Sequence, residues 1–146
     1  MISESNVISK KKSAYFKAAR SISELSNHRC KIGCVVVSSH KIISSGHNSA
    51  TNTHAFQARI DKKYFGCECA GYLHAETDAL LPLIRNNVDL SKASIYIYRR
   101  MKNGGVGMAR PCPRCMSIIK QAKIRDINYT TDDGFANEYI VDNKEF

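Results

Sequence analysis

The sequence contains no tryptophan, only three prolines and no long uninterrupted run of apolar residues. A membrane-spanning helix needs about 20 consecutive, mostly apolar residues. A secretory signal needs an apolar core, and the lysine-rich first thirty residues do not contain one. Internal repeats and low-complexity segments are also missing. These absences predict an intracellular, cytoplasmic protein that does not insert into a membrane.

What the chain does contain is enough apolar material for one packed domain. It has 146 residues, of which 43% are hydrophobic, so it can bury a real core and is neither a disordered tail nor a fibrous repeat. We expect a single domain over residues 1–146 that ends in an acidic tail over residues 132–146. Because a chain of this kind rarely needs disulfides, its six cysteines are expected to remain thiols or to bind metal.

The charge is unevenly distributed. The formal net charge is +9, and the positive excess comes from residues 1–31 and residues 99–125, whereas residues 132–146 are acidic. A strongly basic chain usually meets something anionic, such as nucleic acid, a nucleotide phosphate or a membrane surface. Charge by itself does not choose among these partners. It predicts that an anion site would use the two basic segments.

Hydrophobic periodicity and β-branched runs divide the chain into helices and strands. Helices are expected over residues 10–25, 75–86 and 113–122, and strands over residues 32–38, 41–47, 94–98 and 124–130. Pro82 lies inside the second helix and predicts a kink or a break there. Residues 48–72 have no clear period, so we expect a loop with one short helix near residues 54–60.

The order of these elements predicts an α/β fold. We expect three layers, α/β/α, in which a mixed sheet of about four to five strands carries helices on both faces. Residues 32–38 and 41–47 would form a hairpin, and the later strands would run parallel through helical crossovers.

Two short motifs each begin a predicted helix. Residues 74–76 read His-Ala-Glu, and residues 111–115 read Pro-Cys-Pro-Arg-Cys. Zinc prefers tetrahedral imidazole and thiolate ligands, and a site with three protein ligands leaves a fourth position for water. His74, Cys112 and Cys115 would supply these three ligands. Residues three apart in a first helical turn lie on one side, and a helix N-terminus favours thiolate.

Glu76 follows His74 too closely for both to bind one ion comfortably. Its carboxylate would instead reach the water on the metal, whose pKa the metal lowers toward neutrality. A carboxylate at this place can move protons between that water, a substrate ring nitrogen and a leaving amine. We therefore predict that Glu76 is the catalytic acid and base.

At these residues the sequence resembles the cytidine and deoxycytidylate deaminase superfamily, over about residues 14–131. The resemblance implies that His74, Cys112 and Cys115 bind one catalytic Zn²⁺ and that Glu76 relays protons. It also implies a zinc-dependent hydrolase that deaminates a cytosine nucleotide and forms a homo-oligomer. The Pro-Cys-Pro-x-Cys form is similar to the deoxycytidylate branch of the family.

The resemblance also indicates substrate contacts. Asn48, at the end of the predicted hairpin, matches a substrate-binding asparagine, and the backbone of Ala75 matches a contact to the base edge. Two features depart from the family pattern. Glu76 and Cys112 are separated by an unusually long segment, with the surplus over residues 101–110, and Arg110 stands where small or acidic residues are frequent. We expect Arg110 to bind a substrate phosphate, the first choice among the basic residues near it: Arg99, Arg100, Lys102 and Arg114.

The remaining cysteines allow other sites. Cys67 and Cys69 could join Cys112 and Cys115 in a closed four-thiolate structural site. They could also hold a second, structural zinc together with His47 or His54, or be plain loop thiols. Cys30 and Cys34 flank the first predicted strand and are expected to be small core residues.

The function expected from these features is deamination of dCMP to dUMP with release of ammonia. Two alternatives stay open at this point. One is a deaminase that acts on nucleic acid, either on cytosine in single-stranded DNA or RNA or on tRNA adenosine. The other is a zinc-stabilised nucleic-acid-binding module without catalysis. A small nucleotide is thus the expected partner, with nucleic acid as the alternative and no membrane partner.

Overall fold

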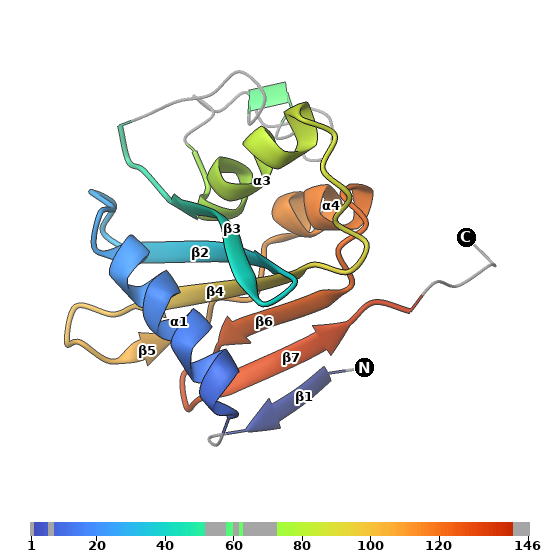
Figure 1. Ribbon diagram of the computed structural model, residues 1–146. Helices are drawn as coiled ribbons and strands as arrows, with labels where there is room; N and C mark the ends of the chain where they lie inside the picture. Colours follow the sequence, from blue (N-terminus) through green and yellow to red (C-terminus); the bar gives the residue numbers. More distant parts are fainter. Residues whose placement is uncertain (1, 6–7, 52–57, 60–61, 63–72, 142–146) are drawn as a thin grey trace.

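The computed structural model describes residues 2–5, 8–51, 58–59, 62 and 73–141. The strands are β1 (Ile2–Ser5), β2 (Lys31–Ser38), β3 (Lys41–His47), β4 (Ser94–Arg100), β5 (Val106–Gly107), β6 (Asp126–Thr130) and β7 (Phe135–Tyr139). The helices are α1 (Lys10–Ser23), α3 (Ala75–Arg85) and α4 (Pro113–Gln121). Figure 1 shows these elements around one sheet. None of the helices in the described residues is long and apolar enough to cross a membrane.

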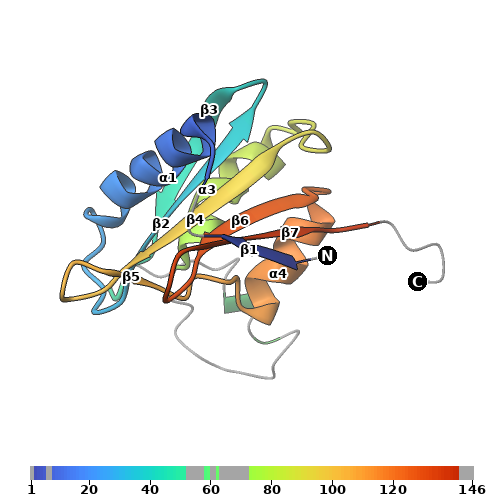
Figure 2. The same ribbon diagram turned by 90° about the horizontal axis from the view of Figure 1, so that it is seen from below.

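The sheet lies between two helical layers. Its strand order is β1-β7-β6-β4-β2-β3, and β5 pairs with β4 outside this path. Helix α1 covers one face, whereas α3 and α4 cover the other (Figure 2). One core cluster gathers on the α1 face around Phe16 and Tyr96, and a larger one joins the sheet to α3 and α4 around Leu80 and Ile119. The expected three-layer α/β/α fold is confirmed.

Strands β2 and β3 form the predicted antiparallel hairpin. Ser39 and His40 make its turn with φ angles of 50° and 64°. Positive φ at both central residues is typical of the tight turns that match the twist of paired strands. Strand β2 also pairs antiparallel with β4, so its run of valines is buried in the middle of the sheet.

Strands β4 and β6 run parallel, as predicted, and α4 connects them. Because parallel strands end at the same edge, the helix that follows β4 begins beside that edge. Helix α3 packs on the same face of the sheet as α4 (Figure 2). The first turns of α3 and α4 therefore approach each other, and both predicted motifs lie there.

Helix α3 is anchored closely to β3. A Cβ atom on Gly46 would come within 2.5 Å of both the Ala75 carbonyl oxygen and the Ala79 nitrogen, so only glycine allows this approach. The Asp78 carboxylate accepts a hydrogen bond from the His47 amide at 3.0 Å. The helix continues through Pro82, whose position inside the helix produces no break.

Three strands were not predicted: β1, β5 and β7. The expected sheet of four to five strands is therefore a seven-stranded sheet. The segment expected as an acidic tail contains β7, which pairs antiparallel with both β6 and β1. Strands β1 and β7 are short and polar, with the sequences ISES and FANEY, so they carry little hydrophobic pattern, and pairing with distant strands decides their structure. Strand β5 has only two residues, too few to show a pattern.

Candidate active site

The three predicted zinc ligands lie at the starts of two helices. His74 is the N-cap residue of α3, and Cys112 is the N-cap residue of α4. Cys115 lies in the first turn of α4 and is completely buried. Pro113 begins α4, where a missing amide hydrogen is no loss because a first-turn amide has no partner inside the helix. The local sequence thus places both thiols and the imidazole at adjoining helix N-termini.

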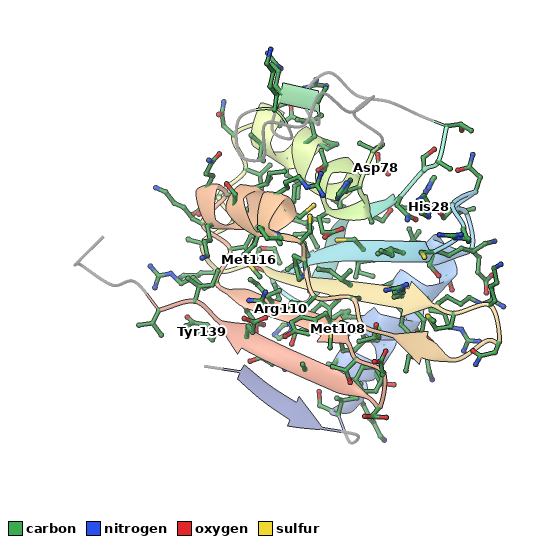
Figure 3. All side chains as sticks on the ribbon, turned by 180° about the vertical axis from the view of Figure 1, so that it is seen from behind. His28, Asp78, Met108, Arg110, Met116 and Tyr139 are labelled. Carbon is green, nitrogen blue, oxygen red and sulfur yellow. The ribbon has the colours of Figure 1, made fainter. Side chains whose placement is uncertain are left out.

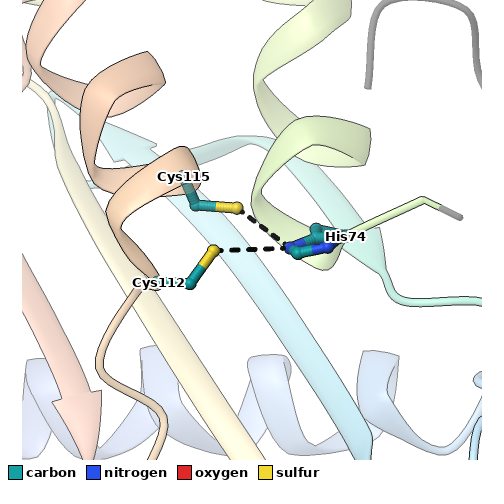
Figure 4. A group of neighbouring side chains, drawn as sticks. All are labelled: His74, Cys112 and Cys115. Atoms are coloured by element: carbon teal, nitrogen blue, oxygen red, sulfur yellow. Dashed lines mark hydrogen bonds between the residues drawn. The ribbon is translucent and has the colours of Figure 1, made fainter. Parts of the chain in front are cut away.

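The geometry of these three side chains fits one zinc ion. The His74 Nδ1 atom lies 3.3 Å from the Cys115 Sγ atom and 3.7 Å from the Cys112 Sγ atom (Figure 4). All three ligand atoms lie within 4.8 Å of one another. A tetrahedron with usual zinc bond lengths has nitrogen-to-sulfur edges of about 3.6 Å. The distances thus point to Nδ1 as the nitrogen of His74 that would bind the ion.

Electrostatics around the two thiols favour one thiolate in the protein without metal. A hydrogen bond from Cys115 lowers the pKa of Cys112 to about 3. The same hydrogen bond, together with burial, raises the pKa of Cys115 well above its usual range. Hydrogen bonding to Cys112 raises the pKa of His74. Because zinc takes thiolates and neutral imidazole, metal binding here would release protons.

Glu76 lies in the first turn of α3 and is only 6% exposed. Burial raises the pKa of its carboxyl group, and the charge of His74 opposes this rise. The carboxyl group also shares a hydrogen bond with Cys115. Glu76 is therefore next to the candidate metal ligands and held in surroundings where proton uptake is easier than in water.

A cavity of about 310 Å³ opens beside these groups. Its walls include His28, Cys30, Ile32, Asn48, Ser49, Leu73, His74, Ala75, Glu76, Arg99, Met108, Ala109, Arg110 and Cys112. The volume falls in the range of small-molecule sites. All the predicted site residues except Cys115 line this cavity, and Cys115 is grouped with the lining residues His74 and Cys112.

Asn48 reaches the cavity but also holds the local backbone together. Its Oδ1 atom accepts hydrogen bonds from Ser26 Oγ at 2.6 Å and from the Ile32 amide at 3.0 Å. Its Nδ2 atom donates to the Cys30 carbonyl oxygen at 2.6 Å. The side chain therefore joins the segment before β2 to the end of β3, whatever contact it makes with substrate.

Arg110 lies at the rim of the cavity and extends toward β7 (Figure 3). Its Nε and Nη2 atoms donate to the two carboxylate oxygens of Glu138, at 2.7 and 3.0 Å. The Tyr129 hydroxyl group donates to the same carboxylate at 2.8 Å. Since a guanidinium has five N–H donors, this bidentate pair leaves donors of Arg110 available to a further anion.

The cavity residues that were not predicted include His28, Cys30 and Met108, whereas Arg99 was one of the basic residues expected near a substrate phosphate. The Cys30 amide donates to His28 Nδ1 at 2.9 Å, so the neutral ring carries its proton on Nε2. Arg99 donates to the Cys30 Sγ atom at 3.3 Å and to the Met108 carbonyl oxygen at 3.4 Å. The sequence carried no signal for His28, Cys30 or Met108, because they come from loops that only the sheet brings together.

The outcome for the other cysteines is mixed. The described cysteines are free thiols, as expected. Cys34 is a fully buried core residue, but the same expectation was wrong for Cys30, which is half-buried and lines the cavity. Cys67, Cys69 and His54 lie outside the described residues, as does most of the short helix expected near residues 54–60. His47 is described, and its Nδ1 atom lies 3.1 Å from the Asn48 carbonyl oxygen.

Solved structures of known deaminases have the same fold. The apo dCMP deaminase of cyanophage S-TIM5 has a TM-score of 0.61 and 26% sequence identity, with 86% of each chain covered. The same enzyme in complex with dCMP and dUMP gives a TM-score of 0.60 at 24% identity over 86% and 85% of the two chains. Cytidine deaminase from Burkholderia pseudomallei has a TM-score of 0.59 and 16% sequence identity, with 87% of this chain and 91% of that chain covered. At identities this low, the last two likenesses concern the fold only.

Comparison with curated proteins finds no match. A family model matches residues 9–131, and its description is the cytidine and deoxycytidylate deaminase zinc-binding region. This match includes all three groups that converge in the structure: the hairpin that carries Asn48, the first turn of α3 and the first turn of α4. The chain belongs to the cytidine and deoxycytidylate deaminase family.

Proposed function

We propose that this protein is a zinc-dependent hydrolase that deaminates a cytosine nucleotide, converting dCMP to dUMP with release of ammonia. One observation carries the proposal: His74, Cys112 and Cys115 meet at tetrahedral spacing beside the buried carboxyl group of Glu76, in a cavity of about 310 Å³. A purely structural zinc site has four protein ligands and excludes solvent. This one has three ligands in the described residues and opens onto a cavity.

His74, Cys112 and Cys115 would hold the ion. Bound there, Zn²⁺ would supply a water molecule of lowered pKa and stabilise negative charge that develops on its oxygen during the reaction. Cys115 is buried, and the other two ligands are half-buried. The side of the metal site that faces the cavity would therefore be open to water and substrate.

Glu76 would move the protons of the reaction. Its carboxylate takes a proton from the attacking water as oxygen bonds to C4 of the cytosine ring, and delivers a proton to ring N3. The second proton of that water then goes to the amino group, the C4–N bond breaks, and ammonia leaves while C4 becomes a carbonyl. The raised pKa of Glu76 suits a group that must both take and give protons near neutral pH.

Three other residues would orient the nucleotide. The Ala75 backbone and Asn48 line the cavity next to Glu76, where they would contact the base and the sugar. Arg110 stands at the rim with guanidinium donors in excess of those that Glu138 uses. A substrate phosphate at the rim would accept hydrogen bonds from these remaining donors of Arg110. This arrangement favours a nucleotide over a nucleoside.

Ammonia release tests the substrate directly. The zinc-loaded protein would be assayed against cytidine, dCMP, dCTP, a single-stranded cytosine-containing DNA and the corresponding RNA. We expect dCMP to give the highest kcat/KM. A higher kcat/KM for either polynucleotide would replace dCMP as the substrate, and no ammonia from any of them would favour a binding module without catalysis.

Glu76→Gln separates catalysis from metal binding. The amide keeps the size of the side chain but cannot carry the proton, so we expect deamination to fall by a factor of about 10² to 10⁴. Zinc content, measured by elemental analysis, should remain one ion per chain. Glu24→Gln, which removes an exposed carboxylate at the end of α1, is the matched control and should keep full activity.

A further inference from the structure

His28 lines the catalytic cavity but has no part in the proposed chemistry. It is half-buried and belongs to the segment between α1 and β2. Figure 3 shows it at the end of the sheet where β2 begins. The proton transfers of the reaction are assigned to Glu76, so the imidazole ring must serve the cavity in another way, if it serves it at all.

The ring of His28 is held by a backbone neighbour. The Cys30 amide donates a hydrogen bond to the His28 Nδ1 atom at 2.9 Å. A ring nitrogen that accepts a hydrogen bond carries no proton, so the neutral ring has its single proton on Nε2. None of the described residues accepts a hydrogen bond from Nε2. The ring therefore offers the cavity one N–H donor in a fixed tautomer.

Two hydrogen-bonded routes connect His28 to Asn48. Ser26 Oγ accepts from the His28 amide at 3.0 Å and donates to Asn48 Oδ1 at 2.6 Å. Cys30 makes the second connection, because its amide donates to the His28 ring and its carbonyl oxygen accepts from Asn48 Nδ2 at 2.6 Å. Both side chains line the cavity, so they are held there as one unit.

This unit presents donors and no free acceptor. The Asn48 Oδ1 atom already accepts from Ser26 Oγ and from the Ile32 amide. Asn48 Nδ2 carries two hydrogens, of which the described residues use one. Its second hydrogen and the Nε2 hydrogen of His28 are left for a ligand. The group that matches two such donors is an oxygen atom with two lone pairs, as in a hydroxyl group.

The proposed orientation of the nucleotide decides which oxygen this is. Deamination puts C4 of the cytosine ring at the metal group, so the sugar on N1 lies on the far side of the ring. The base edge is left to the Ala75 backbone, and the phosphate is assigned to Arg110. Figure 3 shows that Arg110 lies well apart from His28, toward β7. The sugar 3′-hydroxyl group, which leaves the sugar in a different direction from the phosphate, is the oxygen that can face His28 and Asn48.

We propose that His28 is a specificity-determining residue that donates a hydrogen bond from Nε2 to the 3′-hydroxyl oxygen of the nucleotide, beside Asn48. A few precisely placed polar groups commonly fix the orientation of a small ligand in this way. The inference rests on the proposed function, because only that function puts a cytosine nucleotide in the cavity. It adds a requirement for oxygen at C3′ that neither the metal group nor Arg110 imposes.

Ammonia release from dCMP and from its 3′-deoxy analogue, 2′,3′-dideoxycytidine monophosphate, measures this contact. The analogue leaves both donors without an acceptor, so kcat/KM of the zinc-loaded wild type should be about 10 to 100 times higher for dCMP. Ammonia from both nucleotides at equal kcat/KM would overturn the inference and leave the proposed function intact. No ammonia from either nucleotide would overturn both.

His28→Asn and His28→Gln separate substrate contact from support of the backbone. The Asn side-chain oxygen can replace Nδ1 as the acceptor for the Cys30 amide, but no atom of Asn reaches the position of Nε2. Gln can place an N–H donor near that position but loses the acceptor for Cys30. The preference for dCMP over its 3′-deoxy analogue should therefore fall about five- to tenfold in His28→Asn and be largely kept in His28→Gln.

The ratio of the two kcat/KM values is insensitive to partial unfolding, which lowers both values equally. A preference in His28→Asn within about twofold of the wild-type preference would overturn the inference, as would a larger loss of preference in His28→Gln than in His28→Asn. The matched control is His40→Asn, the same substitution at an exposed residue in the turn between β2 and β3. It should leave kcat/KM for both nucleotides unchanged.

Discussion

At the scale of single residues, Arg110 has a structural partner as well as a proposed ligand. Its bidentate pair with Glu138 joins the rim of the cavity to β7, and Tyr129 adds a third hydrogen bond to the same carboxylate. Hydrogen bonding from Arg110 lowers the pKa of Glu138. The arginine is therefore held in place before any phosphate arrives, which reduces the entropy lost on binding.

Arg110→Ala should separate nucleotide from nucleoside. Loss of a charged hydrogen bond to phosphate is worth about 1.5–3 kcal/mol, so KM for dCMP should rise by a factor of about 10 to 100. KM for deoxycytidine should change by less than about twofold. Equal changes for the two substrates would contradict a phosphate role for Arg110.

This substitution also leaves the Glu138 carboxylate without its main partner. The double variant Arg110→Ala with Glu138→Gln controls for that defect, since it removes the orphaned charge. The rise in KM for dCMP, without a matching rise for deoxycytidine, should persist in the double variant if the lost contact is to phosphate.

Glu138→Gln should reveal the ion pair through the pH dependence of stability. The folded-state pKa of Glu138 lies below its usual value of 4.5, so the pair stabilises the fold above that pH and loses its effect as pH falls through the lowered pKa. Because Arg110 is half exposed, solvent screening limits the difference between wild type and variant to about 1 kcal/mol.

Urea unfolding at a series of pH values measures this difference. It should be constant above about pH 5.5 and shrink steadily in more acidic solution. A difference that grew toward low pH would mean that the carboxylate destabilises the fold.

At the scale of elements, the contact of α3 with β3 sets the position of His74. Gly46 allows the first turn of α3 to lie directly against the strand, and Ser44 Oγ donates to the Ala79 carbonyl oxygen at 2.6 Å. His74 stands immediately before this turn. The metal geometry therefore depends on a backbone contact that has no chemical role of its own.

Gly46→Ala should weaken both folding and metal binding. The added methyl group would press on the Ala75 oxygen and the Ala79 nitrogen, and such overpacking typically costs about 1–3 kcal/mol of unfolding free energy. Zinc affinity, measured by competition with a chelating dye, should fall together with the unfolding free energy. Ser45→Ala, at an exposed site on the same strand, is the control and should change neither quantity.

At the scale of the whole molecule, one ion would connect helices from two separate parts of the chain. His74 begins α3 and the two cysteines begin α4, so zinc would join the β2-β3 half of the sheet to the crossover between β4 and β6. Any ligand that binds only the folded state stabilises it by mass action. The metal would thus have a structural effect in addition to its catalytic one.

Removal of zinc should lower the unfolding temperature. At free zinc one hundred times the dissociation constant, the metal contributes about 2.7 kcal/mol, which corresponds to several degrees for a domain of this size. Calorimetry before and after chelation measures the shift, and re-added zinc should restore it. In Cys112→Ser, zinc should raise the unfolding temperature much less than in wild type. The control Cys34→Ala also removes one thiol, but in the core and away from the metal ligands, and zinc should stabilise it as much as it stabilises wild type.

Much of the site followed from local sequence. The His-Ala-Glu and Pro-Cys-Pro-Arg-Cys motifs each begin a helix, so spacing and helix geometry were enough to predict which side chains converge. The hairpin of β2 and β3 and the helix α4 were predicted for the same reason, since alternation and periodicity are visible within a few residues. The long and strongly patterned elements were therefore predicted with nearly correct bounds.

The parts that could not be predicted depend on contacts between distant residues. Strand β7 was expected to be an acidic tail because its own residues are polar, and it becomes a strand through pairing with β6 and β1. Glu138 becomes the partner of Arg110 by the same pairing. His28 carries no motif, and Arg99 was a candidate only because its segment is basic. Both line the cavity because β2 and β4 are neighbours in the sheet.

The sequence by itself determined the layered α/β fold, the ligand chemistry at the starts of α3 and α4, and the amount and location of positive charge. These properties are local, because each is set by residues within one or two helical turns or within one strand. The tertiary structure decided which charges act together. By placing Lys31 opposite Arg100 and Arg110 against Glu138, it divided one basic excess into a cationic pair at the ends of β2 and β4, on the α1 face, and a neutralised pair at the rim of the cavity. Pairing of distant strands is the physical reason, since it brings together charges that no sequence window contains.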